Sequence, residues 1–197
     1  MRLFTALWLP PEPSRHLDAV VNGSEPQRLA AATAGVRRFR FLPADKWHLT
    51  LRFHGEVSEP EPLGEWLERR VRRPARPGTG LVPPRLRLAG AGVFRGVLWV
   101  GVEPAARADA AALGALVRAA GGDPRSYRAH LTVARWRSGR PSDALRGLFA
   151  EYAGPWWSAD EVALVRSEPG REGAVYRTLH RVPVRRNAGE QGGFPNS

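Results

Sequence analysis

The chain has 197 residues, a length that suits one large domain or two small lobes. Its 43% hydrophobic and 25% charged residues are typical of globular proteins and exclude a largely disordered or collagen-like chain. Lys and Arg number 30 against 19 Asp and Glu, and the net charge of +11 indicates an anionic, phosphate-bearing partner. Lys46 is the only lysine, so part of this arginine-rich charge reflects the coding bias of a GC-rich genome rather than function.

The absence of cysteine excludes disulfides and thiolate metal sites. An apolar run over 3–9 ends at Pro10 and Pro11, before it reaches the length of a signal-peptide core or a membrane span. We therefore expect a soluble, cytoplasmic protein that does not associate with membranes.

Apolar periodicity and turn residues predict an alternation of strands and helices. In chain order we expect a strand over 3–9, a helix over 17–21, strands over 36–42 and 47–54, a helix over 63–71, a linker over 76–84, strands over 86–88 and 93–102, a helix over 113–120, a strand over 127–136, a helix over 145–152, and strands over 162–165 and 174–184. This order indicates an α+β fold rather than a doubly wound parallel sheet. The composition changes near the C-terminus, which predicts one domain over 1–186 and a flexible tail over 187–197.

The strand over 47–54 has the clearest alternation, which predicts one buried and one open face. The apolar face is expected to hold Trp47, Leu49, Leu51 and Phe53, and the polar face His48, Thr50, Arg52 and His54.

A tetrapeptide in this strand occurs a second time. His48-Leu49-Thr50-Leu51 is matched by His130-Leu131-Thr132-Val133, also within a predicted strand. With five histidines and six threonines in 197 residues, chance would give far fewer than one His-x-Thr match. The pair is therefore a specific signal, whereas either copy alone would be a weak one.

Strand geometry explains how this spacing could serve chemistry. Residues i and i+2 project from one face about 7 Å apart, so each imidazole has a hydroxyl beside it. Across a groove, one neutral imidazole can accept a proton from the attacking hydroxyl or water while one imidazolium protonates the leaving oxygen of a phosphodiester. Threonine hydroxyls can donate hydrogen bonds to its non-bridging oxygens. By alternation, Arg52 and Arg128 share the faces of the two histidines and are candidate phosphate-binding residues.

Other interpretations of the histidines are less well supported. A histidine on a half-open sheet face is often structural, and His16, His54 and His180 are expected to be so. A zinc site is disfavoured because the motif histidines have no cysteine or carboxylate at ligand spacing. The sequence also has neither a Gly-x-Ser-x-Gly motif nor a glycine-rich phosphate loop with lysine, which disfavours a serine hydrolase and the use of ATP.

With these residues in view, the chain resembles the two-histidine phosphoesterases, and most closely the RNA 2′,3′-cyclic phosphodiesterases, also called 2′-5′ RNA ligases. The resemblance covers nearly the whole chain and is carried by Arg2-Leu3-Phe4, Leu9-Pro10-Pro11, Trp47 to Phe53, Gly55-Glu56-Val57, Gly92-Val93-Phe94, Leu98-Trp99-Val100, Tyr127-Arg128, His130 to Arg135 and Gly173 to Leu179. Three positions depart from the family pattern: Ala129 replaces a proline, Thr5 an apolar or aromatic residue and His54 an aliphatic one. Thr5 and His54 could alter the pocket.

The resemblance implies two pseudo-symmetric lobes, each an antiparallel sheet with two helices, around a basic active-site groove. It makes His48 the proton donor and His130 the proton acceptor, with Thr50 and Thr132 holding the phosphate. It also makes Arg135 a phosphate clamp. Strict alternation points Arg135 away from His130, so this role requires a β-bulge or a strand end. Phe4 or Trp8 could stack on a base, although core packing suits both better.

The function implied is metal-independent hydrolysis of an RNA-terminal 2′,3′-cyclic phosphate to a 2′-phosphomonoester. Attack by a 5′-hydroxyl in place of water would give reversible 2′-5′ ligation. No cofactor and no metal are expected, and the expected partners are RNA ends, with a monomeric protein and no obligate protein partner. Two alternatives remain open from the residues: a non-catalytic arginine-rich RNA-binding module and a small-nucleotide cyclic phosphodiesterase on the same fold.

Overall fold

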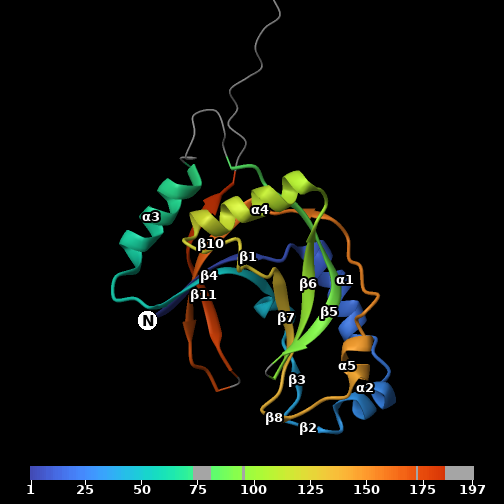
Figure 1. The fold of residues 1–197 in the computed structure, drawn as a ribbon. Helices are drawn as coiled ribbons and strands as arrows, with labels where there is room; N and C mark the ends of the chain where they lie inside the picture. The colour runs from blue at the N-terminus through green and yellow to red at the C-terminus, as the bar shows by residue number, and fades with distance from the viewer. Residues whose placement is uncertain (73–80, 95, 172, 185–197) are drawn as a thin grey trace, which may run out of the picture.

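The structure is a computed structural model that describes residues 1–72, 81–94, 96–171 and 173–184. The predicted tail over 187–197 and part of the predicted linker over 76–84 lie outside the described residues. Figure 1 shows a strongly curled sheet, with α3 and α4 lying together over one part of it and α1, α2 and α5 gathered over another.

Most of the elements follow one another as the apolar periodicity predicts. The first part of the chain forms β1 (Arg2–Trp8), α1 (Pro11–Asn22), α2 (Pro26–Thr33), β2 (Val36–Arg37), β3 (Arg40–Phe41), the 3₁₀ turn η1 (Ala44–Lys46), β4 (His48–Glu56) and α3 (Pro60–Arg72). The rest forms β5 (Arg85–Phe94), β6 (Val97–Pro104), α4 (Arg107–Ala119), β7 (His130–Arg135), β8 (Ser138–Gly139), α5 (Asp143–Gly147), β9 (Trp157–Ser158), β10 (Glu161–Glu168) and β11 (Val175–Pro183). None of the helices in these ranges is long and apolar enough to cross a membrane.

Two antiparallel halves make up the main sheet. Its order is β11-β10-β1-β4-β7-β6-β5-β9, and β3 pairs with β7. The strands β11, β10, β1 and β4 form one half, and β7, β6, β5 and β9 form the other. Between the halves, β4 and β7 are paired at a single position, Leu49 opposite Leu131. The expected α+β fold with two lobes is confirmed, and this pair is the one ladder position shared by β4 and β7.

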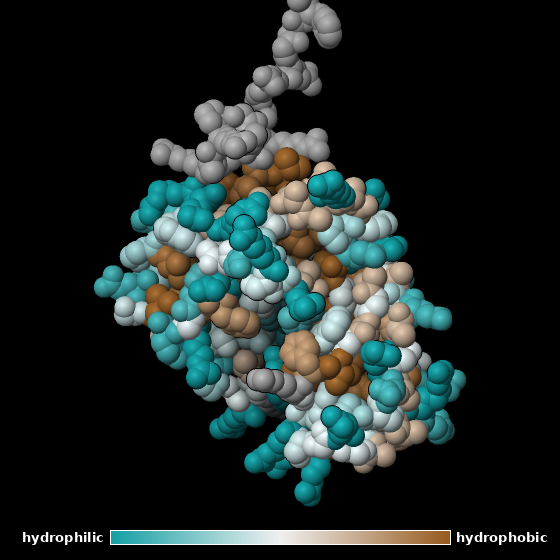
Figure 2. Space-filling view, in the orientation of Figure 1, coloured by the Kyte–Doolittle hydropathy of each residue, from teal (hydrophilic) through white to brown (hydrophobic). Residues whose placement is uncertain are grey.

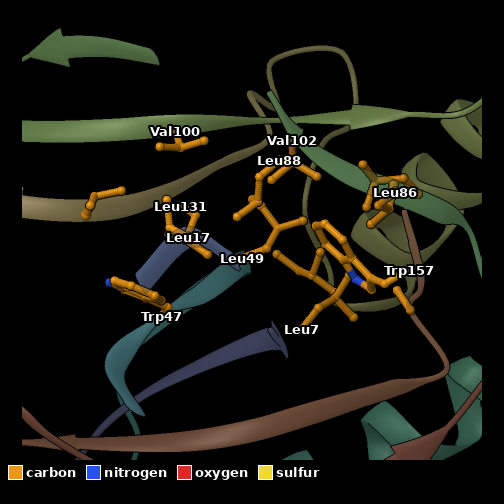
Figure 3. Packing of buried hydrophobic residues seen from close by; sticks show 14 of the residues in the cluster. Leu7, Leu17, Trp47, Leu49, Leu86, Leu88, Val100, Val102, Leu131 and Trp157 are labelled. Atoms are coloured by element: carbon orange, nitrogen blue, oxygen red, sulfur yellow. The ribbon is translucent and has the colours of Figure 1, made fainter. Parts of the chain in front are cut away.

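The lobes share a core. Leu49 and Leu131 are 3% and 1% exposed, and Figure 3 shows them among the packed residues around Leu17 of α1. A second, smaller cluster lies on the other face of β1 and contains Phe4, Ala6, Ala163 and Val165, with Trp8 and Tyr176 packed against it. Successive residues of β1 thus alternate between the two clusters, as the pleat of a strand requires.

Several element boundaries differ from the sequence-based expectation. The strand expected over 36–42 is two short strands, because Arg38 between them has a φ of 57° and breaks the extended backbone. The strand expected over 93–102 is divided by a hairpin turn at Gly96, whose φ of 77° suits glycine. The helix expected over 145–152 ends after Gly147, and α2 was not predicted because it buries only Ala32 and so has little apolar periodicity.

A β-bulge in β4 changes which side chains lie on the same face of the sheet as His48. Thr50 is opposite Ala6 and Arg52 is opposite Thr5, so Leu51 is an extra residue that reverses the alternation beyond it. The prediction that Phe53 packs in the core is therefore wrong: its side chain is 69% exposed. Arg52 and His54 are both predicted to share the face of His48, and the bulge makes this wrong for each. Arg52 lies opposite Thr5 in the ladder, and His54 hydrogen-bonds that wholly buried threonine on the side away from His48.

Candidate active site

A cavity of about 760 Å³ lies where the two halves of the sheet meet. All seven residues selected from the sequence line it: His48, Thr50, Arg52, Arg128, His130, Thr132 and Arg135. They come from β4, from β7 and from the segment just before β7. The structure thus brings together residues that are more than 70 positions apart in the chain.

The single β4–β7 pair sets the relative placement of the two motifs. Because the strands are antiparallel and Leu49 is opposite Leu131, His48 lies beside Thr132 and Thr50 beside His130. Leu49 and Leu131 point into the core, so the flanking residues point to the other face. The motifs are related by a pseudo-twofold axis through this pair, with one His/Thr pair on each side.

A second β-bulge brings Arg135 to the same face. In the β6–β7 ladder Trp99 is opposite Thr132 and Leu98 is opposite Ala134, so Val133 is the extra residue. The bulge that a role for Arg135 required is present, and Arg135 lines the cavity together with His130. Both motif strands therefore bulge at the residue after the motif threonine.

Both motif histidines are held in the same way. Nδ1 of His48 donates to the Lys46 carbonyl at 2.8 Å, and Nδ1 of His130 donates to the Arg128 carbonyl at 2.8 Å. Because a carbonyl oxygen only accepts, Nδ1 carries a proton in each ring. Nε2 is consequently the atom that gains or loses the proton, which is the arrangement needed for acid–base work.

Aromatic rings surround His48. Phe4 stacks on it with 4.8 Å between ring centroids, and Trp8 and Tyr176 meet it edge-on at 5.4 and 5.1 Å. Trp8 is fixed in turn by a hydrogen bond from its Nε1 to Thr178 at 3.1 Å. Burial among these rings lowers the pKa of His48 to about 4; the Lys46 carbonyl opposes the shift, and the charges of Arg135 and His130 add to it.

His130 has a more open environment. Phe94 and Trp99 meet its ring edge-on, at 5.5 and 6.1 Å between centroids, and Phe94 is itself 45% exposed. The two rings therefore have identical backbone partners and different surroundings, which allows identical motifs to take different roles.

The cavity is electropositive. Besides Arg52, Arg128 and Arg135, it is lined by Arg2 and Lys46, with Asp123 as the one acidic side chain among the described lining residues. The charge of Arg135 acts on His48, whereas the charge of Arg52 acts on His54, whose pKa is lowered by burial and by that charge. Among the three arginines selected from the sequence, Arg135 is the one whose charge lowers the pKa of His48.

Tyr127 bridges the two lobes and was not selected from the sequence. Its hydroxyl donates to the Thr50 carbonyl at 2.9 Å, one residue beyond the single β4–β7 pair. This bond ties the segment before β7 to the backbone of β4 beside the motif threonine. Burial raises the pKa of Tyr127, so the hydroxyl remains a donor. No feature of the sequence marks this contact, because it depends on where the strands part.

The remaining histidines have structural partners, as expected. His16 is 3.1 Å from the Tyr152 hydroxyl, and His180 is 3.2 Å from Glu68. Thr5 and His54, the two departures thought able to alter the pocket, hydrogen-bond each other at 2.8 Å and do not line the cavity. In the described part of the chain, no group of three or more His, Asp or Glu side chains is placed to hold a metal ion.

Comparisons with known proteins find a matching family and several solved structures of similar fold. Residues 10–171 match the family model of the 2′-5′ RNA ligase superfamily. A Thermus thermophilus protein of solved structure, TT0787, is 28% identical, with a TM-score of 0.62 over 93% of this chain and 98% of its own. A protein described as a phosphoesterase is 25% identical, with a TM-score of 0.65 over 93% and 97%. Escherichia coli LigT, crystallised with NADP⁺, is 26% identical, with a TM-score of 0.62 over 93% and 96%. Direct comparison with curated protein sequences gives no match.

Proposed function

Because the chain belongs to the 2′-5′ RNA ligase superfamily, we propose that it hydrolyses RNA-terminal 2′,3′-cyclic phosphates to 2′-phosphomonoesters, with His48 and His130 as a metal-independent acid–base pair. The observation that carries the proposal is the matched pair of imidazoles in one cationic cavity, each with Nδ1 bound to a carbonyl and Nε2 left for proton transfer. The LigT structure with NADP⁺ agrees with a scaffold that accepts nucleotides.

The proposed reaction is a single displacement at phosphorus. Water attacks the phosphorus, and Nε2 of His130 accepts its proton as the new P–O bond forms. The bond from phosphorus to O3′ breaks, and Nε2 of His48 donates a proton to that oxygen. The product keeps its phosphate on O2′. His130 then loses a proton to solvent and His48 gains one, which returns both rings to their starting protonation states. A 5′-hydroxyl attacking in place of water would leave a 2′-5′ linkage.

The other lining residues stabilise the charge that develops on the phosphate. The Thr50 and Thr132 hydroxyls donate hydrogen bonds to the non-bridging oxygens, and the guanidinium of Arg135 pairs with the same anion. The anion also acts on His48. A negative charge beside the ring opposes the effect of Arg135, so substrate binding raises the pKa of His48 and allows it to act as a donor.

The test uses a short RNA ending in a 2′,3′-cyclic phosphate, with EDTA present. Wild-type protein is expected to form the 2′-phosphate, while His48→Ala and His130→Ala each lose about 10²- to 10⁴-fold in kcat. His180→Ala, which removes a histidine on β11 bonded to Glu68, is the matched control and should keep wild-type activity. Loss of wild-type turnover in EDTA would overturn the proposal. Salt-dependent RNA binding without turnover would indicate the non-catalytic module instead.

A mononucleotide substrate distinguishes hydrolysis of RNA ends from the other alternative, a small-nucleotide cyclic phosphodiesterase. If the protein acts on RNA ends, the cyclic phosphate at the end of an oligonucleotide should give a higher kcat/KM than a 2′,3′-cyclic mononucleotide. Equal or greater kcat/KM for the mononucleotide would favour a small-nucleotide phosphodiesterase.

A further inference from the structure

The residue two positions before each motif histidine is a cation. Lys46 precedes His48 and Arg128 precedes His130, and the carbonyl of each accepts the hydrogen bond from Nδ1 of its histidine at 2.8 Å. Both side chains line the cavity. The pseudo-twofold axis that relates the two motifs therefore also relates Lys46 to Arg128, with one of them on each side of the two His/Thr pairs.

The cavity has a cationic end that Lys46 shares with Arg135. Because β4 and β7 are antiparallel and pair at Leu49 and Leu131, the residue before the first motif lies beside the residues that follow the second. Within the described residues, none of the ion pairs involves Lys46 or Arg135. The two charges are not compensated by a carboxylate of that part of the chain, so this end of the cavity can take a second anionic group besides the phosphate between the histidines.

Lys46 is placed one strand step from His48. Trp47 between them has an extended backbone, with φ −80° and ψ 118°, and is 1% exposed in the core. Lys46 and His48 therefore point to the same side, with their Cα atoms about 7 Å apart. A lysine ammonium stands on a flexible four-carbon stem, so it reaches a group that lies just beyond the part of the substrate that His48 contacts.

We propose that Lys46 is a specificity-determining residue that binds the phosphodiester on the 5′ side of the terminal nucleotide. The inference rests on the proposed function, in which His48 protonates O3′ and the ribose of that nucleotide lies on the His48 side of the cavity. The next anionic group beyond this ribose is the phosphodiester that joins it to the rest of the chain. The contact therefore distinguishes the end of an RNA chain from a lone nucleoside cyclic phosphate, and it is indifferent to the base.

The other cations of the cavity fit this role less well. Arg135 pairs with the scissile phosphate in the proposed reaction. Arg128 and Arg52 lie at the opposite end of the paired motifs, and Arg2 is bonded to Glu56 at 3.1 Å. Figure 2 shows hydrophilic residues alternating with apolar patches on this face, which suits a partner that carries both charged phosphates and flat bases.

The experiment compares two dinucleotides that end in a 2′,3′-cyclic phosphate and differ only in the linkage between their nucleosides. One has a natural phosphodiester, and the other has an uncharged methylphosphonate. Wild-type protein is expected to have a KM about 5- to 50-fold lower for the charged dinucleotide, the range for one hydrogen bond to a charged group. Lys46→Gln should have nearly equal KM values for the two, with kcat within about 3-fold of wild type. Lys46→Arg, which keeps the charge, should keep most of the preference.

Arg28→Gln is the matched control, because it removes one positive charge from an exposed position of α2 that does not line the cavity. Its preference should equal that of wild type. Arg128→Gln removes the equivalent cation at the other end and should affect both dinucleotides alike. The proposal is overturned if wild-type protein does not distinguish the dinucleotides, if Lys46→Gln keeps the preference, or if Arg128→Gln abolishes it.

A binding measurement separates this contact from the proposed catalysis. Lys46 is the only lysine, so reductive ¹³C-methylation labels it and the Met1 amine, which is not among the described lining residues, and keeps both charges. Adenosine 2′,5′-bisphosphate should shift the Lys46 NMR signal, whereas adenosine 2′-monophosphate should shift it much less, with Met1 as the reference. If Lys46 responds to the 5′-phosphate but neither dinucleotide is turned over, the contact stands and the hydrolysis fails. If turnover is normal and the two ligands shift the signal equally, the contact fails and the hydrolysis stands.

Discussion

His48 and His130 occupy equivalent places in two copies of one motif, and their surroundings differ. His48 is enclosed by Phe4, Trp8 and Tyr176, with ring centroids 4.8 to 5.4 Å away. His130 meets Phe94 and Trp99 at 5.5 and 6.1 Å, on a more open part of the cleft. Both rings are oriented by a carbonyl two residues upstream. The backbone therefore repeats, while the side chains from other strands make the two halves of the site unequal.

The comparison teaches that a symmetric motif can serve an asymmetric reaction. A displacement at phosphorus needs one proton acceptor and one proton donor at the same time. Two rings in equal environments would compete for each role. In this site burial and nearby positive charge lower the pKa of His48, which by itself favours its neutral form, so its role as donor depends on the negative charge of the bound phosphate. The two halves also differ in that Arg135 of β7 has an apolar counterpart, Phe53, in β4.

Arg135→Gln tests whether this asymmetry is used in catalysis, and outside the two motif histidines it should have the largest effect. The variant removes the cation that pairs with the phosphate, so kcat/KM should fall about 10²- to 10³-fold, the range seen when one oxyanion-stabilising group is lost. Arg128→Gln removes another arginine that lines the same cavity but does not act on the pKa of His48; it is the matched control and should lose no more than about tenfold. Equal losses for the two variants would mean that general positive charge, rather than the position of Arg135, binds the phosphate.

The pH dependence of stability tests the enclosure of His48. Its pKa is about 4 in the folded protein against 6.5 in the unfolded chain. As pH falls from 6.5 to 4, the unfolded chain binds the proton first, so the free energy of unfolding decreases across this window. The decrease due to His48 is about 3 kcal/mol.

Urea denaturation at pH 7 and pH 4 measures this contribution. His48→Gln should lose that part of the pH dependence, whereas His130→Gln, the same change in the more open half, should keep it. Identical pH dependence in wild type and His48→Gln would show that His48 is not enclosed as described.

Tyr127→Phe tests how firmly the two halves are held together, and its effect should be the smallest. The change removes one hydrogen bond to the Thr50 carbonyl, so the free energy of unfolding should fall by about 1–2 kcal/mol. Without this bond the two His/Thr pairs are held less firmly relative to each other, which should lower kcat by about 3- to 10-fold with little change in KM. Tyr152→Phe, which removes a hydroxyl bonded to His16 outside the cleft, is the control. An unchanged kcat for Tyr127→Phe would show that the Leu49–Leu131 pair alone sets the spacing.

The candidate site was largely predictable because each of its His/Thr pairs lies within one short stretch of the sequence. A histidine and a threonine two residues apart on a strand must share a face, and the repeat indicated that two such pairs meet. Register then follows from a single contact, Leu49 with Leu131, once the strands are antiparallel. The need for a bulge before Arg135 also followed from strand alternation, and the bulge is present at Val133.

What could not be predicted depends on contacts between distant segments. Nothing in the local sequence marks the bulge at Leu51, so alternation placed Phe53 in the core and His54 beside His48. Thr5 and His54 looked like separate departures, and only pairing of β1 with β4 shows that they bond to each other. The enclosure of His48 likewise comes from β1 and β11, which contribute Trp8 and Tyr176 from opposite ends of the chain.

The assignment of His48 as donor and His130 as acceptor is tested most directly by changing the leaving group. In a 2′,3′-cyclic phosphate whose O3′ is replaced by sulfur, the thiolate leaves without needing a proton. On this substrate His48→Ala should regain turnover to within about tenfold of wild type, whereas His130→Ala should remain about 10²-fold or more below it. Rescue of His130→Ala in place of His48→Ala, or of neither variant, would contradict the account.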